Sequence, residues 1–229
     1  MRLLCLSDLH GRADALSAVL ATAEDHGWDQ VLVAGDLCFP GPDPLGVWRR
    51  LQQIGAVCVQ GVGDRALIAL DPVKVKPQDE FERARLERLV EIRQELGEAI
   101  LRQIAGLPAT FRLALPTGDE LLLVHGSPGD PLEPMTHDLS DDGLRAMIGP
   151  DPASLVLCGG SHVPFDRTVS RLGAAQPDGP LVRVVNLGSV GESPGSDGSG
   201  RRFADAAFVD CSVDAMEVIQ FVVPLGHTM

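Results

Sequence analysis

The chain opens with Met1-Arg2-Leu3-Leu4-Cys5-Leu6-Ser7-Asp8-Leu9-His10-Gly11, and this stretch decides the fold. The apolar run from Leu3 to Leu6 is short, which favours a buried strand over a helix. Asp8 and His10 follow it two residues apart, so on an extended backbone both side chains point to one side. Ligands of open α/β sheets bind at the C-terminal ends of strands. A carboxylate and an imidazole that converge there suggest half of a metal site.

The next segments repeat this arrangement. Residues 13–25 have helical apolar spacing, and Val31 to Ala34 predicts a second strand that ends at Gly35-Asp36. Residues 45–54 predict a helix, and residues 56–59 predict a third strand that leads to Asp64. Strands that alternate with helices predict a parallel sheet with right-handed crossovers.

Beyond residue 77 the pattern changes. Residues 78–107 predict a long helix with a charged, solvated face, and Pro116-Thr117-Gly118-Asp119 predicts a hairpin between two strands. Further segments are expected as a helix at 139–148, strands at 110–115, 120–125, 154–158, 166–171, 181–187, 206–211 and 215–223, and a mobile loop at 192–200. We expect a mostly antiparallel second half and one domain spanning residues 1–229.

The composition narrows the classes of partner. The net charge of −13, with 4% aromatic residues and no tyrosine, disfavours long nucleic acid, because phosphate backbones need basic surfaces and bases need stacking platforms. Five dispersed cysteines without CxxC spacing predict a reducing compartment. No apolar run approaches the length of a membrane span. We therefore expect a cytoplasmic protein without a membrane partner.

Polar residues follow several of the predicted strands. They are Asp8 and His10, Asp36, His125 and His162, with Asp64 close to the end of the third strand. A lone histidine at a strand end is more often a hydrogen-bonded surface or core residue. Several such residues at the ends of separate strands are harder to explain in that way, because these ends meet in a sheet. We expect the side chains to converge.

The motifs resemble those of the calcineurin-like metallophosphoesterases, in particular the small bacterial phosphodiesterase-type members. They are Ser7-Asp8-Leu9-His10-Gly11, Gly35-Asp36, Val124-His125-Gly126 and Gly159-Gly160-Ser161-His162, followed by Asn186-Leu187-Gly188-Ser189-Val190. The resemblance implies a four-layer α/β/β/α sandwich. It also implies two divalent metals bridged by an aspartate, and hydrolysis of a phosphate ester.

The resemblance assigns a complete set of ligands to the first metal: Asp8, His10, Asp36 and His162. Two carboxylates and two imidazoles suit Mn, Fe or Zn better than Ca or Mg. A cation at this site would activate a water for attack on phosphorus.

The second metal matches only in part. Asp36 and His125 fit the family pattern, but Val62 and Gly160 stand where the family has an asparagine and a histidine ligand. Gly63 replaces a further histidine that usually contacts the phosphate or protonates the leaving group. We expect a second cation to bind weakly, with His125 holding it or contacting the phosphate.

Other residues near the motifs are candidates for catalysis. Arg12 and Arg65 could stabilise charge on phosphoryl oxygens, because a guanidinium donates two bonds to phosphate at once. Alternatively, both arginines are solvated or pair with Asp14 and Asp64. Asp64 is itself a catalytic candidate as the remnant of its motif. His137 could act as an acid or a spare ligand.

Two functions from different classes follow. The leading hypothesis is a metal-dependent phosphoesterase, using metal-activated water on a phosphodiester or phosphomonoester of a small nucleotide or phosphorylated metabolite. The alternative is a non-catalytic protein of the same fold that binds or scaffolds and keeps at most one metal. In a third hypothesis the protein is metal-free and Asp8 only pairs with His10. The sequence indicates neither the substrate nor the oligomeric state.

Overall fold

The computed structural model describes residues 1–171, 179–194 and 201–227. The first of its two sheets has the strand order β10-β9-β1-β2-β3. Its strands are β1 (Arg2–Leu6), β2 (Gln30–Val33), β3 (Val57–Cys58), β9 (Arg201–Cys211) and β10 (Met216–His227). The strands β1, β2 and β3 are parallel, as expected, and β9 and β10 are antiparallel additions at the β1 edge.

The second sheet has the order β4-β5-β6-β8-β7. Its strands are β4 (Thr110–Ala114), β5 (Glu120–Val124), β6 (Leu155–Cys158), β7 (Phe165–Ser170) and β8 (Leu181–Asn186). The expectation of a mostly antiparallel second half is wrong for the centre of this sheet, where β5, β6 and β8 run parallel. The hairpin β4–β5 is confirmed. Each sheet therefore has a parallel trio whose C-terminal ends carry loops.

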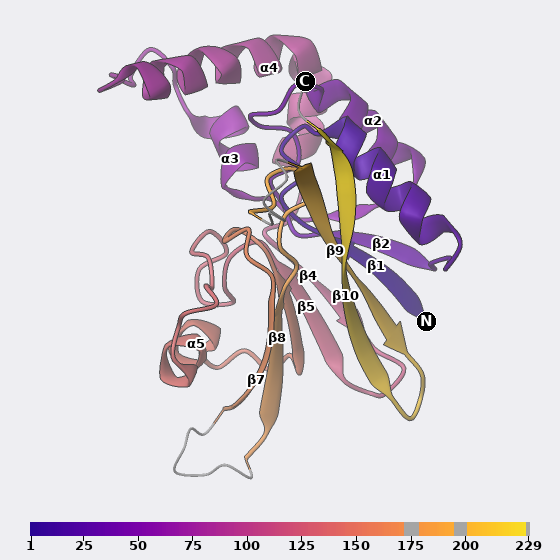
Figure 1. The fold of residues 1–229 in the computed structure, drawn as a ribbon. Coiled ribbons are helices and arrows are strands. Elements are labelled where there is room, and N and C mark those ends of the chain that lie inside the picture. Colours follow the sequence, from indigo (N-terminus) through magenta and orange to yellow (C-terminus); the bar gives the residue numbers. More distant parts are fainter. Residues whose placement is uncertain (172–178, 195–200, 228–229) are drawn as a thin grey trace.

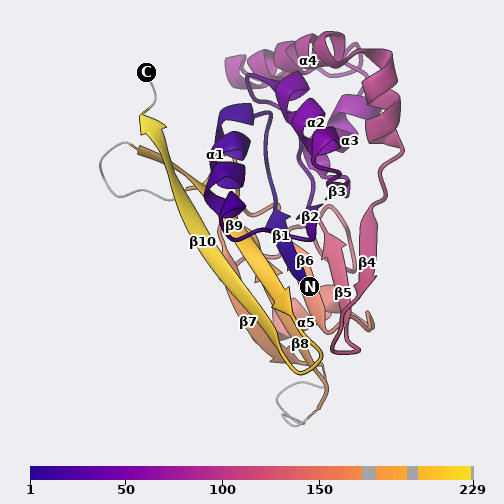
Figure 2. The ribbon, with the colours of Figure 1, turned by 90° about the vertical axis from the view of Figure 1, so that its right-hand side faces the viewer.

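Helices cover the outer face of each sheet (Figure 1). On the first sheet lie α1 (Ala13–Glu24), α2 (Pro44–Gln53), α3 (Val62–Ala69) and α4 (Glu80–Ala105), and on the second lies α5 (Asp141–Ile148). In Figure 2, β9 and β10 run along one side of the molecule while α1 to α4 cover its upper part. The four-layer α/β/β/α architecture is confirmed.

The apolar residues of β1 pack on both faces of the first sheet. Leu4 and Leu6 point into the cluster beneath α1 to α4, whereas Leu3 and Cys5 point into the cluster between the sheets. This alternation follows from the two-residue period of a strand. A third apolar cluster joins the second sheet to α5. Because β1 is buried on both faces, every residue from Leu3 to Leu6 is apolar.

Two helical features differ from the expectation. The eight-residue helix α3 begins at Val62, in a segment that we expected to be a strand end, and it places Gly63 and Asp64 in its first turn. The long helix α4 is broken at Gly97, which has φ 71° and ψ 165°. Residues 195–200 of the expected mobile loop lie outside the described residues.

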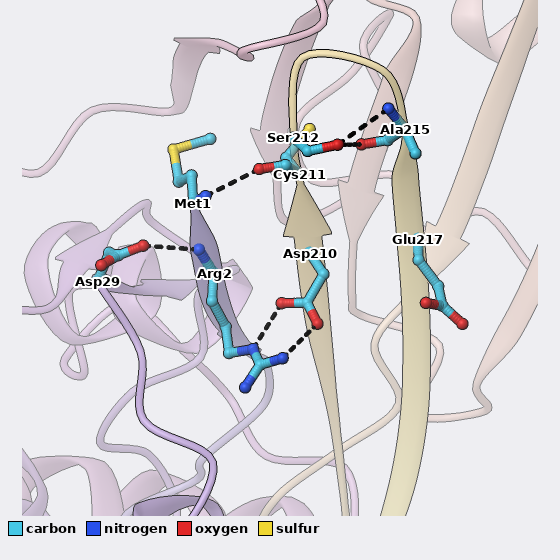
Figure 3. Close-up of a pocket in the computed structure, with 8 residues that line it drawn as sticks. All are labelled: Met1, Arg2, Asp29, Asp210, Cys211, Ser212, Ala215 and Glu217. Atoms are coloured by element: carbon cyan, nitrogen blue, oxygen red, sulfur yellow. Dashed lines mark hydrogen bonds and ion pairs between the residues drawn. The ribbon is translucent and has the colours of Figure 1, made fainter.

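A pocket lies at the start of β1 (Figure 3). There the Arg2 guanidinium binds Asp210 with two hydrogen bonds of 2.6 and 2.7 Å, and the Arg2 backbone N–H donates to Asp29. These contacts fix β1 between β9 and the loop before β2. The pocket is at the opposite end of β1 from Asp8, so it does not adjoin the strand ends that carry the candidate ligands. No helix in the described part of the chain is long and apolar enough to cross a membrane.

Candidate metal centre

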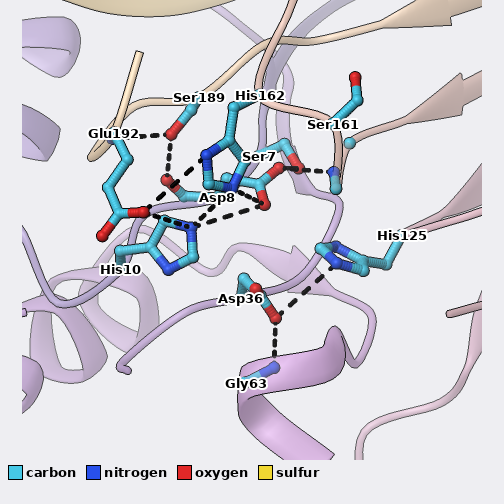
Figure 4. Close-up of polar contacts among 12 residues, drawn as sticks. Ser7, Asp8, His10, Asp36, Gly63, His125, Ser161, His162, Ser189 and Glu192 are labelled. Carbon is cyan, nitrogen blue, oxygen red and sulfur yellow. Dashed lines mark hydrogen bonds and ion pairs between the residues drawn. The ribbon is translucent and has the colours of Figure 1, made fainter. Parts of the chain in front are cut away.

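The structure brings together the polar residues that follow the strands. Asp8 and His10 follow β1, Asp36 follows β2, His125 follows β5 and His162 lies in the loop after β6. Figure 4 shows these side chains gathered in one cluster, with His125 directed at Asp36 and His162 beside Asp8 and His10. Their ligand atoms form two groups, within each of which all atoms lie within 4.8 Å of one another.

The first group consists of Asp8, His10 and His162. The two Nε2 atoms of the histidines lie 3.0 Å apart. Asp8 Oδ1 lies 3.2 Å from His162 Nε2 and 3.7 Å from His10 Nε2. Three donor atoms, two from the loop after β1 and one from the loop after β6, thus lie close together.

Asp8 provides the test of whether this group fits a cation. Its side chain is fully buried, and Oδ2 accepts hydrogen bonds from Ser7 Oγ at 2.5 Å and from the Gly160 N–H at 2.9 Å. The other oxygen, Oδ1, is buried and accepts no hydrogen bond. A buried carboxylate oxygen without a partner is costly. The donor set therefore fits a cation, which would satisfy Oδ1.

The ring orientation of the histidines supports the same conclusion. His10 Nδ1 lies 2.7 Å from the Phe39 carbonyl oxygen, and His125 Nδ1 lies 2.7 Å from the Ala34 carbonyl oxygen. A carbonyl oxygen can only accept a hydrogen bond, so Nδ1 carries the hydrogen and donates it, and in the neutral ring Nε2 keeps the free lone pair. Metal-binding histidines are commonly oriented in this way.

The second group consists of Asp8, Asp36 and His125. Asp8 is therefore the shared residue, whereas the family pattern assigns the bridge to Asp36. Asp36 Oδ1 lies 3.8 Å from His125 Nε2 and already accepts a hydrogen bond from the Gly63 N–H at 2.7 Å. This carboxylate oxygen is partly satisfied by the start of α3.

Two positions that hold ligands in the family pattern carry Gly160 and Val62 here. Gly160 lies beside the second group, and Val62 lies at the start of α3. A Cβ on Gly160 would lie 3.3 Å from His125 Nε2, so a side chain there would start at the second group. Val62 is the first residue of α3, next to Gly63, and is 49% exposed. Neither residue offers a donor side chain.

The electrostatics of the cluster also favour a cation. Burial opposes ionisation of Asp8, but the imidazoles of His162 and His125 outweigh it and lower the pKa of this carboxyl. Burial raises the pKa of Asp36, opposed by His125 and supported by the charge of Asp8. The carboxylate of Asp8 raises the pKa of His162, and those of Asp36 and Asp8 raise the pKa of His125 against its burial. His125 and His162 thus hold protons more tightly because they face the carboxylates of Asp8 and Asp36. A cation between these residues would neutralise the same negative charge.

The backbone at these residues is strained. In the described part of the chain, the non-glycine residues with positive φ are Asp8, His10, Asp36 and His162, at 54°, 47°, 53° and 60°. Such a conformation costs about 1–3 kcal/mol per residue and persists where the surroundings enforce it, often at functional sites. All four are the residues that the family pattern assigns to the first metal.

The strain is maintained by contacts between the loops. The N–H of His10 donates to the Asp36 carbonyl at 2.9 Å, and Ser189 Oγ donates to the Asp8 carbonyl at 2.9 Å. Asn186 is fully buried and donates to the Gly159 carbonyl at 2.8 Å, which ties the end of β8 to the loop of His162. The predicted motif at Asn186 to Val190 thus buttresses the centre.

Comparison with known proteins agrees with this geometry. Residues 1–211 match the calcineurin-like phosphoesterase superfamily domain. This chain belongs to the calcineurin-like phosphoesterase superfamily. The resemblance drawn from the motifs is confirmed. The superfamily is metal-dependent, in agreement with the two ligand groups described above. No curated protein matches the sequence.

Several solved structures superpose over nearly the whole chain. A hypothetical protein from Pyrococcus horikoshii OT3 has a TM-score of 0.79 at 20% identity, covering 98% of this chain and 88% of that one. A metallophosphoesterase from Sphaerobacter thermophilus has a TM-score of 0.73 at 22% identity, covering 99% and 90%. The phosphoesterase Yfce from E. coli has a TM-score of 0.50 at 19% identity, covering 99% and 100%. At these identities the likeness establishes the fold alone.

The other predicted site residues lie outside the two groups. Asp64 is fully buried, and its oxygens accept hydrogen bonds from the backbone N–H groups of Leu37 and Gly61 at 3.0 and 2.9 Å. It therefore clamps the loop after β2 to the start of α3. Burial, together with the charge of Asp36, raises the pKa of Asp64 to about 6.

The cationic candidates and His137 are more peripheral. Arg12 Nε lies 3.6 Å from Asp14 Oδ1, which corresponds to the pairing that we kept as an alternative. Arg65 is exposed on α3, and His137 is exposed in the loop before α5. Among the polar contacts of the described residues, none joins these three side chains to the ligand groups.

Sequence reasoning missed Glu192. Its Oε2 lies 3.7 Å from His10 Nε2 and 3.9 Å from His162 Nδ1. The residue belongs to no motif and lies in a segment that we expected to be a mobile loop. Its position just after the Asn186 to Val190 motif was the signal that could have identified it, since that motif ends beside Asp8.

Proposed function

We propose that this protein is a metal-dependent phosphoesterase that hydrolyses a phosphodiester or phosphomonoester of a small nucleotide or phosphorylated metabolite. The observation that carries the proposal is the buried, unpartnered Oδ1 of Asp8, which faces the Nε2 atoms of His10 and His162. The superfamily assignment supports the same class of chemistry. All five cysteines are free and buried, which supports a reducing compartment.

Asp8, His10 and His162 would hold a divalent cation of the Mn, Fe or Zn type, because imidazole and carboxylate donors together suit these ions. When bound, such a cation supplies Lewis acidity, which activates water at neutral pH and offsets charge on phosphoryl oxygens. Asp36 and His125 border the same space and would contact the phosphate or a weaker second cation. The carbonyls bonded to His10 and His125 keep their Nε2 atoms directed into the centre.

Arg12 and Arg65 are proposed to contribute positive charge near the entering phosphate. Arg12 directly follows the Asp8 to Gly11 motif and precedes the first residue of α1, and Arg65 follows Asp64 on α3. Charge on an exposed guanidinium acts over a distance that salt limits to about 10 Å at moderate ionic strength. The net charge of −13 favours a small substrate over a long polyanion.

A second candidate is a non-catalytic binding or scaffold protein that keeps one cation. The absence of donor side chains at Val62 and Gly160 favours it, since both would belong to a second metal. Exposed apolar side chains near α3 and α4, at Val62, Val73 and Phe81, also suit a protein-binding surface.

One set of measurements separates the two candidates. Elemental analysis of the purified full chain counts the cations per chain, and hydrolysis of an aryl phosphodiester and an aryl phosphomonoester is measured with Mn, Co, Ni and Mg. Asp8→Asn serves as the inactive control, because it keeps the shape of the side chain. Phosphoesterase function predicts turnover by the wild type well above that of Asp8→Asn. A bound cation with equal, background rates in both proteins would leave the scaffold function.

A further inference from the structure

The first ligand group would leave coordination positions open on the metals proposed for it. Its members supply one carboxylate and two imidazoles. Zinc sites have four ligands, and Mn or Fe sites commonly have more, some of them from water or substrate. The fourth ligand of the family pattern, Asp36, groups instead with Asp8 and His125. A further protein donor near His10 and His162 would complete the group.

Glu192 is the carboxylate in that position. Its Oε2 and the Oδ1 of Asp8 each lie 3.7 Å from His10 Nε2, the nitrogen that faces the centre. Figure 4 shows the Glu192 side chain directed at the rings of His10 and His162. Its side chain is 45% exposed, so it has room to move onto a cation held by the buried residues.

The backbone before Glu192 is fixed to the centre. Ser189 Oγ donates to the Asp8 carbonyl at 2.9 Å and accepts the Glu192 N–H at 2.8 Å. The N–H groups of Val190 and Gly191 donate to the carbonyls of Ser7 and Asp8 at 3.0 and 2.9 Å. The fold therefore fixes the backbone of Glu192 beside the first group.

Gly191 allows this close approach. A Cβ at residue 191 would lie 2.4 Å from the Leu9 carbonyl oxygen, a distance that no real side chain adopts. Only glycine lets the segment lie directly against the loop between Asp8 and His10. The hydrogen bonds of Val190 and Gly191 to the loop after β1 thus place the next residue, Glu192, beside the histidines.

We propose that Glu192 is an additional protein ligand of the cation held by Asp8, His10 and His162. This inference rests on the proposed function for the existence of the cation, but not on turnover. It adds a second carboxylate to the one carboxylate and two imidazoles of the first group.

The test measures metal binding rather than activity. The full chain is freed of metal by dialysis against a chelator, and the dissociation constant for Co²⁺ is measured by competition with a chelating indicator. The visible absorption of the Co²⁺ protein reports the ligand set. Glu192→Gln removes the charge and keeps the size, Glu192→Asp keeps the carboxylate, and Glu133→Gln removes one charge from an exposed glutamate in the loop after β5.

We expect Glu192→Gln to raise the Co²⁺ dissociation constant by at least about 10- to 100-fold, the loss that follows even from changes behind the ligands. The Co²⁺ spectrum should change, Glu192→Asp should retain part of the affinity, and Glu133→Gln should match the wild type. Circular dichroism confirms that the variants are folded.

Three results would overturn the inference: a wild type that binds no Co²⁺, equal affinities for wild type and Glu192→Gln, or lower affinity with an unchanged spectrum. The last would mean that Glu192 acts through charge or through His162 and is not a ligand. Failure of the proposed function has a different signature, because a wild type that binds Co²⁺ through Glu192 but hydrolyses no phosphate ester leaves this inference intact.

Discussion

The two ligand groups share Asp8 but differ in how their other donor atoms are satisfied. In the first group, the Nε2 atoms of His10 and His162 face Asp8 Oδ1, which has no hydrogen-bond partner. In the second group, Asp36 Oδ1 already accepts the Gly63 N–H. The first group therefore has a buried oxygen that a cation would satisfy, and the second is partly satisfied by the protein itself.

The difference lies in what the protein backbone supplies to each group. Gly63 is in the first turn of α3, where backbone N–H groups have no partner within the helix and carry partial positive charge. This charge lies against Asp36, where the family pattern has a second cation. The Gly63 N–H thus partly offsets the charge of Asp36 where Val62 and Gly160 offer no donor side chain, whereas Asp8 Oδ1 accepts no hydrogen bond.

The largest expected effect is on metal affinity, and it should distinguish Asp8, which belongs to both groups, from Asp36, which belongs to one. Asp8→Asn should weaken Mn²⁺ or Co²⁺ binding by more than about 100-fold, beyond the loss known for residues behind the ligands. Asp36→Asn should weaken it less, because Asp36 belongs only to the second group. Chelator competition with both variants measures the two constants. Equal losses would break the division into two groups.

A substitution of Asp64 tests whether this residue stabilises the loops around the second group or takes part in catalysis. Asp64→Ala leaves the buried N–H groups of Leu37 and Gly61 without acceptors, and each costs about 1–3 kcal/mol. We expect the free energy of unfolding to fall by about 2–4 kcal/mol in urea titrations. Affinity for the first cation should change only a few-fold. An unchanged free energy of unfolding together with abolished turnover would instead show that Asp64 is catalytic.

The same residue predicts a pH dependence of the metal-free protein. The pKa of Asp64 is raised from 3.8 to about 6, so the folded state binds more protons than the unfolded state between these values. Its contribution to stability is present below pH ~4 and is lost as the pH rises toward ~6, by at most about 3 kcal/mol. Urea titrations across this range should therefore give a deficit of Asp64→Asn relative to wild type that shrinks with rising pH. A constant deficit would contradict the raised pKa.

Restoring the lost donors should convert the second group into a stronger site. Val62→Asn combined with Gly160→His adds an amide and an imidazole, and the histidine starts 3.3 Å from His125 Nε2. We expect a second cation per chain by elemental analysis and an affinity gain of about tenfold at that site. Because Gly160 has φ 74°, the histidine should cost about 1–2 kcal/mol of stability. Gly160→Ala is the control for this strain. An unchanged metal count would mean that these positions do not face the second group.

The sequence predicted most of this architecture because its strands are buried on both faces and therefore form continuous apolar runs. Val31 to Ala34 and Leu121 to Val124 are examples, and polar residues mark where such runs end. The helix α3 escaped prediction because it is short, begins with Val62-Gly63 and is held by Asp64, whose partner Leu37 is 27 residues away.

The site was predicted in its chemistry but not in its grouping. The motifs named all five residues of the two ligand groups, and side-chain type was sufficient for that. Whether Asp36 joins His10 or His125 depends on loop conformations with positive φ, which non-glycine residues rarely reveal in sequence. Glu192 escaped prediction because its proximity to His10, 182 residues away in sequence, arises only when the segment after β8 docks on the loop after β1.

The smallest expected effect concerns the charge around the second group. Arg65 is exposed on α3, two residues beyond the Gly63 N–H that Asp36 accepts, and none of the described side chains in either group contacts it. Arg65→Ala should therefore raise KM for an aryl phosphate only about two- to fivefold at low salt, through long-range attraction that salt screens. The effect should vanish at about 0.5 M NaCl, where the screening length is a few ångströms. Arg65→Lys keeps the charge and serves as the control. A loss of kcat that persists at high salt would instead mean that the Arg65 guanidinium contacts the phosphate directly. Positive charge near the second group would then come from a side chain as well as from the N-terminus of α3.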